Sequence, residues 1–279
     1  MFSRRHPYLF FILVMMVIMT LSNIAFVLLG KVGKKEPEGE KIGVIEIAGT
    51  IMDSRLFLED IKKFREDDTI QAIVIRIDSP GGGVGPSQEI YAAIRRAGEK
   101  KPVIASLGSV AASGGYYAAS ATDGIMSNQG TITGSIGVIL GYTNFGAIIE
   151  KIGLKPVVIK SGENKDMGSP VKDLTPEQEV ILQTFVDRLH KQFVRDVAQG
   201  RGMKEEEVAL LADGRIYSGE EALEIGLVDR IGNFEDALTW AAEEAGISDT
   251  KWYPVYPERD LPFLARMLEG SAQSFVDAL

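Results

Sequence analysis

SVAASGGYYAAS, residues 109–120, is the stretch of the sequence from which the fold can be worked out. It joins a predicted strand, 103–106, to a segment of helical character, 116–121. Ser113 therefore falls at a strand-to-helix turn, where a hydroxyl flanked by small residues is accessible and the N–H of Gly114 can face an oxyanion. A tightly packed helix start, in which Ala and Gly allow close backbone approach, explains the same composition equally well.

A second glycine-rich segment, DSPGGGV at 78–84, follows another predicted strand, 70–77. It matches neither the GxxxxGK[ST] phosphate loop nor the GxGxxG dinucleotide pattern. Glycines leave backbone N–H groups unobstructed, and one such donor aimed at a developing oxyanion is worth about 3–4 kcal/mol in comparable sites. Gly82 is the preferred donor, and a bare turn is the alternative interpretation.

Short apolar runs alternate with helical segments along the rest of the chain. Strands are predicted at 42–47, 70–77, 103–106 and 155–159, and helices at 56–65, 87–99, 116–121 and 144–152. Strands rich in Val and Ile that alternate with helices need crossover connections. The pattern predicts an α/β fold with a largely parallel sheet.

The longest predicted helix runs over 176–198, with Thr175 as N-cap, Gln178 three residues later and Gly200 as its stop. His190 lies at the edge of the apolar stripe of this helix, where a partly buried structural side chain is expected rather than a catalytic base. The stripe is predicted to face the core and consists of Ile181, Leu182, Phe185, Val186, Leu189, Phe193 and Val197.

Composition excludes several classes of function. The 279 residues carry a formal net charge of −9 and a pI near 5.0, which argues against nucleic-acid binding. The chain has no cysteine and only two distant histidines, so disulfides, thiolate nucleophiles and a metal site are not expected. No cofactor site is visible in the sequence.

A serine nucleophile needs a base within hydrogen-bond reach. His6 precedes a long apolar segment and His190 lies in a core-facing helix, so a Ser-His-Asp triad is not expected. A neutral lysine is the remaining common choice. Spacing alone does not select which lysine.

An uncharged apolar segment at 8–29 is long enough to span a membrane as a helix, and it is too long for a typical cleaved signal peptide. The sequence thus predicts a transmembrane anchor. The flanking charges, Arg4 and Arg5 before it and Lys31, Lys34 and Lys35 after it, leave its orientation open. The predicted organisation is a tip at 1–7, the anchor at 8–29, a linker at 30–41, a folded domain at 42–245 and a tail for packing or assembly at 246–279.

Five motifs in order give the segment 42–240 a resemblance to signal peptide peptidase A, a family of membrane-anchored serine peptidases with a Ser/Lys dyad. The resemblance implies a fold similar to Clp protease subunits and crotonases, in the short, single-domain form of the family. The motifs are DSPGGGV at 78–84, SVAASGGYYAAS at 109–120, TGSIGV at 133–138, SGENKDMGSP at 161–170 and DGRIYSGEEALEIGLVD at 213–229.

The resemblance also implies a role for each matching residue. Ser113 is similar to the acylated nucleophile and Lys165 to the general base, while Ser135 resembles the hydroxyl that orients the lysine ammonium. Gly82 and Gly114 are the implied oxyanion donors, with no metal or cofactor.

The family forms ring-like homo-oligomers in which the serine and the lysine can come from neighbouring subunits. It degrades leftover signal peptides and other apolar peptides. Its members are single-pass proteins of the cell membrane, with the N-terminus in the cytoplasm and the catalytic domain outside it. The resemblance implies the same organisation here.

Three alternatives share much of this pattern. A related membrane protease that works with stomatin-like partners uses the same dyad on much the same fold. A crotonase-type enzyme uses a similar oxyanion loop without a serine nucleophile. A membrane scaffold of the same fold would keep the glycine loops only as turns.

Overall fold

The computed structural model describes residues 2–32 and 38–258, with the backbone alone for residues 2, 3 and 23–32. The chain divides into two compact units, Met1–Gly39 and Glu40–Leu279. The predicted linker at 30–41 and the predicted tail at 246–279 therefore lie partly outside the described residues.

The first unit contains two helices, α1 (Phe2–Arg5) and α2 (Pro7–Val32). The predicted anchor at 8–29 falls within α2. Over the residues that the structure describes, no helix combines the length with the apolar character that crossing a bilayer requires. The transmembrane helix therefore stays a prediction.

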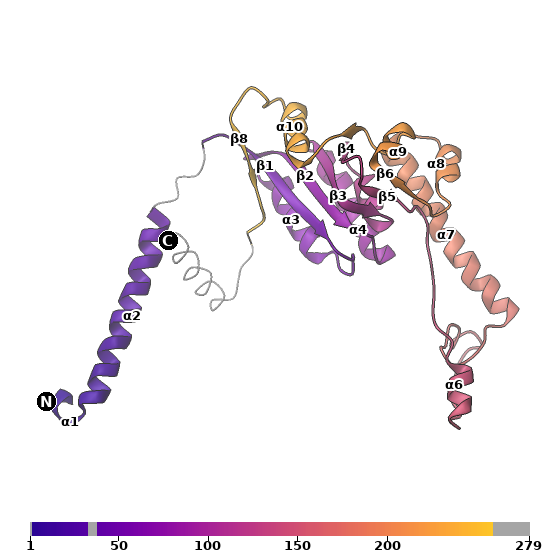
Figure 1. Cartoon of the computed structure of the whole chain (residues 1–279), viewed down its shortest axis with the longest axis horizontal. Coiled ribbons are helices and arrows are strands. Elements are labelled where there is room, and N and C mark those ends of the chain that lie inside the picture. Colours follow the sequence, from indigo (N-terminus) through magenta and orange to yellow (C-terminus); the bar gives the residue numbers. More distant parts are fainter. Residues whose placement is uncertain (1, 33–37, 259–279) are drawn as a thin grey trace. The chain divides into compact units, whose positions relative to one another are not determined.

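The second unit is built on an eight-stranded sheet in the order β6-β5-β3-β2-β1-β8 (Figure 1), with β4 paired to β3 and β7 paired to β4. All pairings are parallel except β5 with β6. This mixed α/β unit confirms the predicted largely parallel sheet and fits a Clp/crotonase-like fold. The strands are β1 (Glu40–Ala48), β2 (Ile70–Ser79), β3 (Val103–Ala112), β4 (Gly124–Ser127), β5 (Ile132–Gly134), β6 (Ile216–Ser218), β7 (Arg230–Ile231) and β8 (Trp252–Val255).

Successive side chains of a strand point to opposite faces of the sheet. The strands carry apolar side chains on both faces, and helices cover each face. Ile45 and Ile47 of β1 join the larger core with α3 and α4, whereas Ile42 and Val44 join a smaller core with α10. The helices of this unit are α3 (Arg55–Glu66), α4 (Val84–Gly98), α5 (Gly114–Ala119), α6 (Gly146–Lys151), α7 (Pro176–Arg201), α8 (Glu205–Leu211), α9 (Gly219–Glu224) and α10 (Phe234–Glu244).

Strand β3 changes its partner along its length. Its first half, Ile104–Leu107, pairs with β4, and its last three residues, Val110–Ala112, pair with β5. The other edge of β3 pairs with β2, where Ser79 lies opposite Ala111. The end of β3 is therefore held between two strands, and the next residue is Ser113.

Helix α7 begins as predicted, with a reciprocal capping box between Thr175 and Gln178. It continues to Arg201 and stops at Gly202, whose φ of 64° suits glycine, so the predicted stop at Gly200 is wrong.

The predicted core face of α7 is only half correct. Phe193 and Val197 are buried, but Ile181 is 42% exposed and Phe185 is 51% exposed. The reason is that the first half of α7 extends beyond the sheet (Figure 1). His190 is half-buried, as expected for a structural side chain.

The strand predicted at 155–159 is wrong. These residues pair with no strand in the described structure and belong to a projection, residues 139–175, that we call the arm. Figure 1 shows the arm running from β5 to α6 and back to the start of α7. Its exposed apolar side chains are Ile139, Leu140, Tyr142, Phe145, Ile148, Ile152, Leu154, Val157, Val158 and Ile159.

Helix α7 packs closely against Ser120 at Gly200, and this contact can be tested by its effect on stability. A Gly→Ala change inside a helix ordinarily stabilises it by about 1 kcal/mol. A Cβ at Gly200 would lie 1.8 Å from the Ser120 carbonyl oxygen. We therefore expect Gly200→Ala to lower the free energy of unfolding, measured in urea, by about 1–3 kcal/mol, as overpacking does. The exposed neighbour Gln199→Ala is the control, and a gain in stability for Gly200→Ala would contradict this packing.

Candidate active site

Ser113 occupies a strained turn between β3 and α5. Its φ of 52° and ψ of −120° are unusual for a residue with a side chain, and such backbones cost about 1–3 kcal/mol. Two hydrogen bonds of 2.8 Å hold the turn: the Ser113 N–H donates to the Gly134 carbonyl, and the Ser113 carbonyl accepts from the Tyr117 N–H. The side chain is half-buried.

Ser135 lies next to this turn, because Gly134 before it binds the backbone of Ser113. Within the described ranges, Ser135 and Ser113 are the only residues other than glycine with a positive φ, which is 51° at Ser135. The Ser135 N–H donates to the carbonyl of Arg215, the residue before β6, at 2.8 Å. The segment after β5 is therefore fixed to the chain just before β6. The Ser135 side chain is half-buried.

The glycine loop after β2 is fixed against Ile51, which follows β1. Ile51 donates its N–H to the Gly81 carbonyl at 2.9 Å and accepts from the Gly83 N–H at 2.8 Å. Gly82 lies between these bonds, and a Cβ there would come within 2.2 Å of the Ile51 carbonyl oxygen. Only glycine fits this position without displacing the loop.

The loop and the serine turn pack against each other. A Cβ at Gly114 would lie 2.4 Å from the Ser87 hydroxyl oxygen and 3.3 Å from the Gly82 nitrogen. Within the described part of the chain, neither the Gly82 N–H nor the Gly114 N–H donates a hydrogen bond to another protein group. Two free amides beside a serine hydroxyl are the arrangement that stabilises an oxyanion.

A cavity of about 110 Å³ opens at this junction. Ser113, Gly82 and Gly114 all line it. The remaining lining residues are mainly apolar or uncharged, namely Val84, Ser87, Gln88, Tyr117, Gly137, Val138, Ile139, Leu189 and Phe193. No histidine, lysine or carboxylate is among them.

Tyr117 forms a rigid wall of the cavity. Its hydroxyl donates to the Asp196 carboxylate, and its ring stacks on Tyr91 at 4.9 Å and meets Phe193 edge-on at 4.8 Å between ring centroids. Burial and the Asp196 carboxylate raise the pKa of Tyr117, so the phenol stays protonated and neutral. Sequence reasoning missed this wall, although Tyr117 lies in the motif that carries Ser113.

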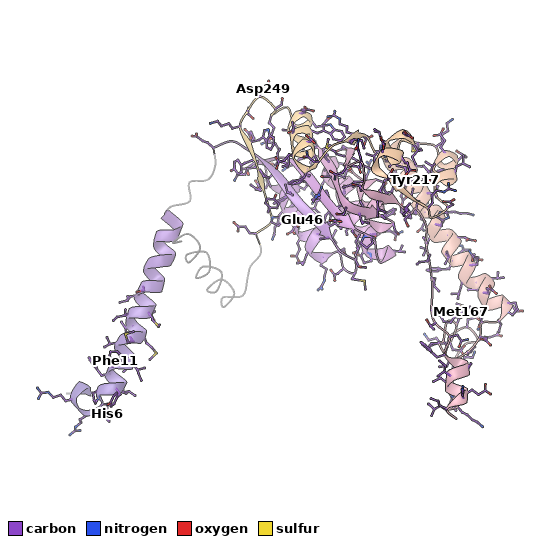
Figure 2. The ribbon with its side chains drawn as sticks, in the orientation of Figure 1. His6, Phe11, Glu46, Met167, Tyr217 and Asp249 are labelled. Atoms are coloured by element: carbon purple, nitrogen blue, oxygen red, sulfur yellow. The ribbon has the colours of Figure 1, made fainter. Side chains whose placement is uncertain are left out.

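Lys165 lies apart from Ser113 in the single chain. It is exposed on the arm and is not among the residues that line the cavity. Figure 2 shows where this part of the arm lies: Met167, two residues further on, is well away from Tyr217 of β6. Within one chain, the cavity therefore holds the candidate nucleophile and the candidate oxyanion donors, and Lys165 is not among its lining residues.

These features define a class of protein: a serine hydrolase built on a crotonase-like sheet. A family model described as Peptidase family S49 matches residues 95–248. The chain is 45% identical over 235 residues to a candidate protease of Synechocystis sp., covering 84% of this chain and 85% of that protein.

Two further relatives extend the comparison. A candidate signal peptide peptidase, SppA, of Enterococcus faecium is 42% identical, over 69% of this chain and 56% of its own length. A candidate protease of Methanocaldococcus jannaschii is 33% identical, over 71% of this chain and 63% of its own length. The matches thus span little more than half of these two proteins. The chain belongs to peptidase family S49, the signal peptide peptidase A family, and is a serine peptidase.

The glycine loop gives a prediction for activity. We expect Gly82→Ala to lower kcat/KM about 100-fold or more, because the added Cβ displaces the Gly82 amide from the oxyanion position. Gly85→Ala is the matched control, since a Cβ there meets nothing within 4 Å. Peptidase assays of both variants decide the point. Equal activities would show that the Gly82 amide is not an oxyanion donor.

Proposed function

We propose that this protein is a serine endopeptidase that degrades leftover signal peptides and other apolar peptides through a Ser113/Lys165 dyad. The observation that carries the proposal is the strained placement of Ser113 beside the free amides of Gly82 and Gly114. The apolar walls of the cavity favour apolar substrates. The relative from Enterococcus faecium, named for signal peptides, supports the substrate class.

The proposed reaction is peptide hydrolysis in two steps. Ser113 Oγ attacks the carbonyl carbon of the substrate while its proton passes to the neutral Lys165 Nζ. The Gly82 and Gly114 N–H groups bind the oxyanion. The C–N bond then breaks, the leaving amine takes the proton from Lys165, and water hydrolyses the acyl-enzyme with Lys165 again as base.

The site is proposed to form between subunits of a ring-like homo-oligomer. The arm carries Lys165 away from the cavity of its own chain, and the apolar side chains of the arm are exposed, including Ile139 and Ile159 at 97% each. When a neighbouring subunit covers these side chains, Lys165 of the first subunit comes close to Ser113 of the neighbour. Burial there would favour the neutral form of a lysine, and we propose that Ser135, which lies beside the serine turn, orients the amine.

We further propose that residues 8–29 anchor the protein in the cell membrane as a single pass, with the N-terminus in the cytoplasm and the catalytic unit outside. The support is the uncharged run of the sequence and its helical backbone within α2. An anchor in the bilayer would hold the peptidase close to the membrane, where apolar peptide remnants collect.

Mixing two inactive variants tests the shared site. We expect Ser113→Ala and Lys165→Ala each to lose activity while keeping the oligomeric state. Subunits reassembled from an equal mixture should recover about a quarter of the wild-type activity, because random neighbours restore one complete Ser/Lys pair in about four. No recovery from reassembled rings would contradict pairing between subunits, and full activity of either variant alone would contradict the dyad.

The pH profile of cleavage tests lysine as the base. A lysine accepts a proton only in its neutral form, so kcat/KM should rise as the pH increases from neutral to alkaline. The wild type can be followed with a fluorogenic apolar peptide while its oligomeric state is monitored at each pH. A rate that falls above neutrality in an intact oligomer would contradict a lysine base.

A further inference from the structure

The lysine loop, residues 160–172, contains three lysines, and one carboxylate binds two of them. Asp166 Oδ1 lies 2.8 Å from Lys160 Nζ, and Asp166 Oδ2 lies 2.9 Å from Lys172 Nζ. Lys160 also donates to the Glu163 carbonyl at 2.6 Å. Hydrogen bonds from Lys160 and then Lys172 lower the pKa of Asp166 to about 2. The two ends of the loop are therefore joined through a single side chain.

The residue before Lys165 is held as well. Asn164 Oδ1 accepts from Gln178 Nε2 at 3.4 Å. Gln178 is only 3% exposed and completes the capping box of α7, so this contact ties the loop to a helix end. The backbone adds a turn in which the Lys165 N–H donates to the Gly162 carbonyl at 3.2 Å.

Lys165 therefore lies between two residues whose side chains are fixed. Its own side chain is exposed and makes no ion pair with any of the described residues. Asp166, its immediate neighbour, would be the nearest carboxylate in sequence, but both of its oxygens are occupied by other lysines. The side chain of Lys165 is thus left exposed, while Asp166 forms ion pairs with the other two lysines of the loop.

We propose that Asp166 is a positioning residue for Lys165: by binding Lys160 and Lys172 it closes the lysine loop and fixes the backbone from which Lys165 reaches a neighbouring Ser113. The inference rests on the proposed Ser/Lys dyad. It also explains why the carboxylate is held away from Lys165. A carboxylate paired with that lysine would favour its charged form, which cannot accept the serine proton.

Loss of the Asp166 contacts should affect the chemical step rather than substrate binding. Lys165 is needed to move a proton, while the cavity at Ser113 binds the substrate, so a loosened loop lowers the fraction of correctly placed bases without changing peptide binding. Misplacement of a catalytic group by about 1 Å can cost about 100-fold in rate. A loss confined to kcat, with KM unchanged, is the signature of such a role.

The test compares carboxylate variants within one loop. We expect Asp166→Asn to lower kcat about tenfold or more, with KM changed less than about twofold, and Asp166→Glu to recover most of the rate. Glu163→Gln is the matched control: it removes the same charge from the same loop, but the Glu163 side chain is exposed and makes no ion pair within the described ranges. It should retain wild-type kinetics.

The outcomes separate this inference from the proposed function. If Lys165→Ala is inactive and Asp166→Asn keeps wild-type kcat, the positioning role is wrong. If Lys165→Ala itself stays active, the dyad is wrong instead. Should Asp166→Asn fail to assemble, Lys160→Met, which leaves the Lys172 ion pair, decides: an intermediate fall in kcat supports the role, and an unchanged kcat overturns it.

Discussion

One hydrogen bond, from the Ser113 N–H to the Gly134 carbonyl, fixes the serine turn at the end of β3. A serine with φ of 52° is unfavourable by itself. It persists because β3 is paired on both edges there, with β2 through Ala111 and with β5 through Val110–Ala112. The glycine loop follows β2 at the same carboxyl end of the sheet, where Ser79 lies opposite Ala111. The pairing of β2 with β3 therefore brings the glycine loop and the serine turn side by side.

This rigid half of the site contrasts with the arm. The arm exposes a series of large apolar side chains and carries Lys165 beyond the reach of its own cavity. Several large apolar side chains left exposed on one segment are typical of interaction sites. Under the proposed function, the separated base has a physical use: an isolated subunit would hold the nucleophile without its base, and assembly would join the two. Peptidase activity would then be restricted to the assembled protein.

Sequence reasoning predicted the parts of the fold that follow from local pattern. The alternation of Val- and Ile-rich runs with helices located β1, β2 and β3, and the Thr175 capping box located the start of α7. The strand-to-helix position of Ser113 and the glycine loop at 78–84 were each recognised from local pattern, but only the resemblance to a known family joined them in one site. Two of the failures have a common cause. The apolar runs at 155–159 and 181–185 were read as buried structure, but the pattern of apolar residues does not distinguish a surface that faces the core from one that is left exposed in the single chain.

In the proposed mechanism, one chain supplies the nucleophile and the oxyanion donors while a neighbour supplies the base. An experimental structure of the assembled full chain tests it most directly, through the distance from each Ser113 Oγ to the nearest Lys165 Nζ. We expect a distance of about 2.6–3.2 Å, or one bridging water, to a lysine of a different subunit. Lysines that face solvent in every subunit, or that fold back to the serine of their own chain, would contradict it.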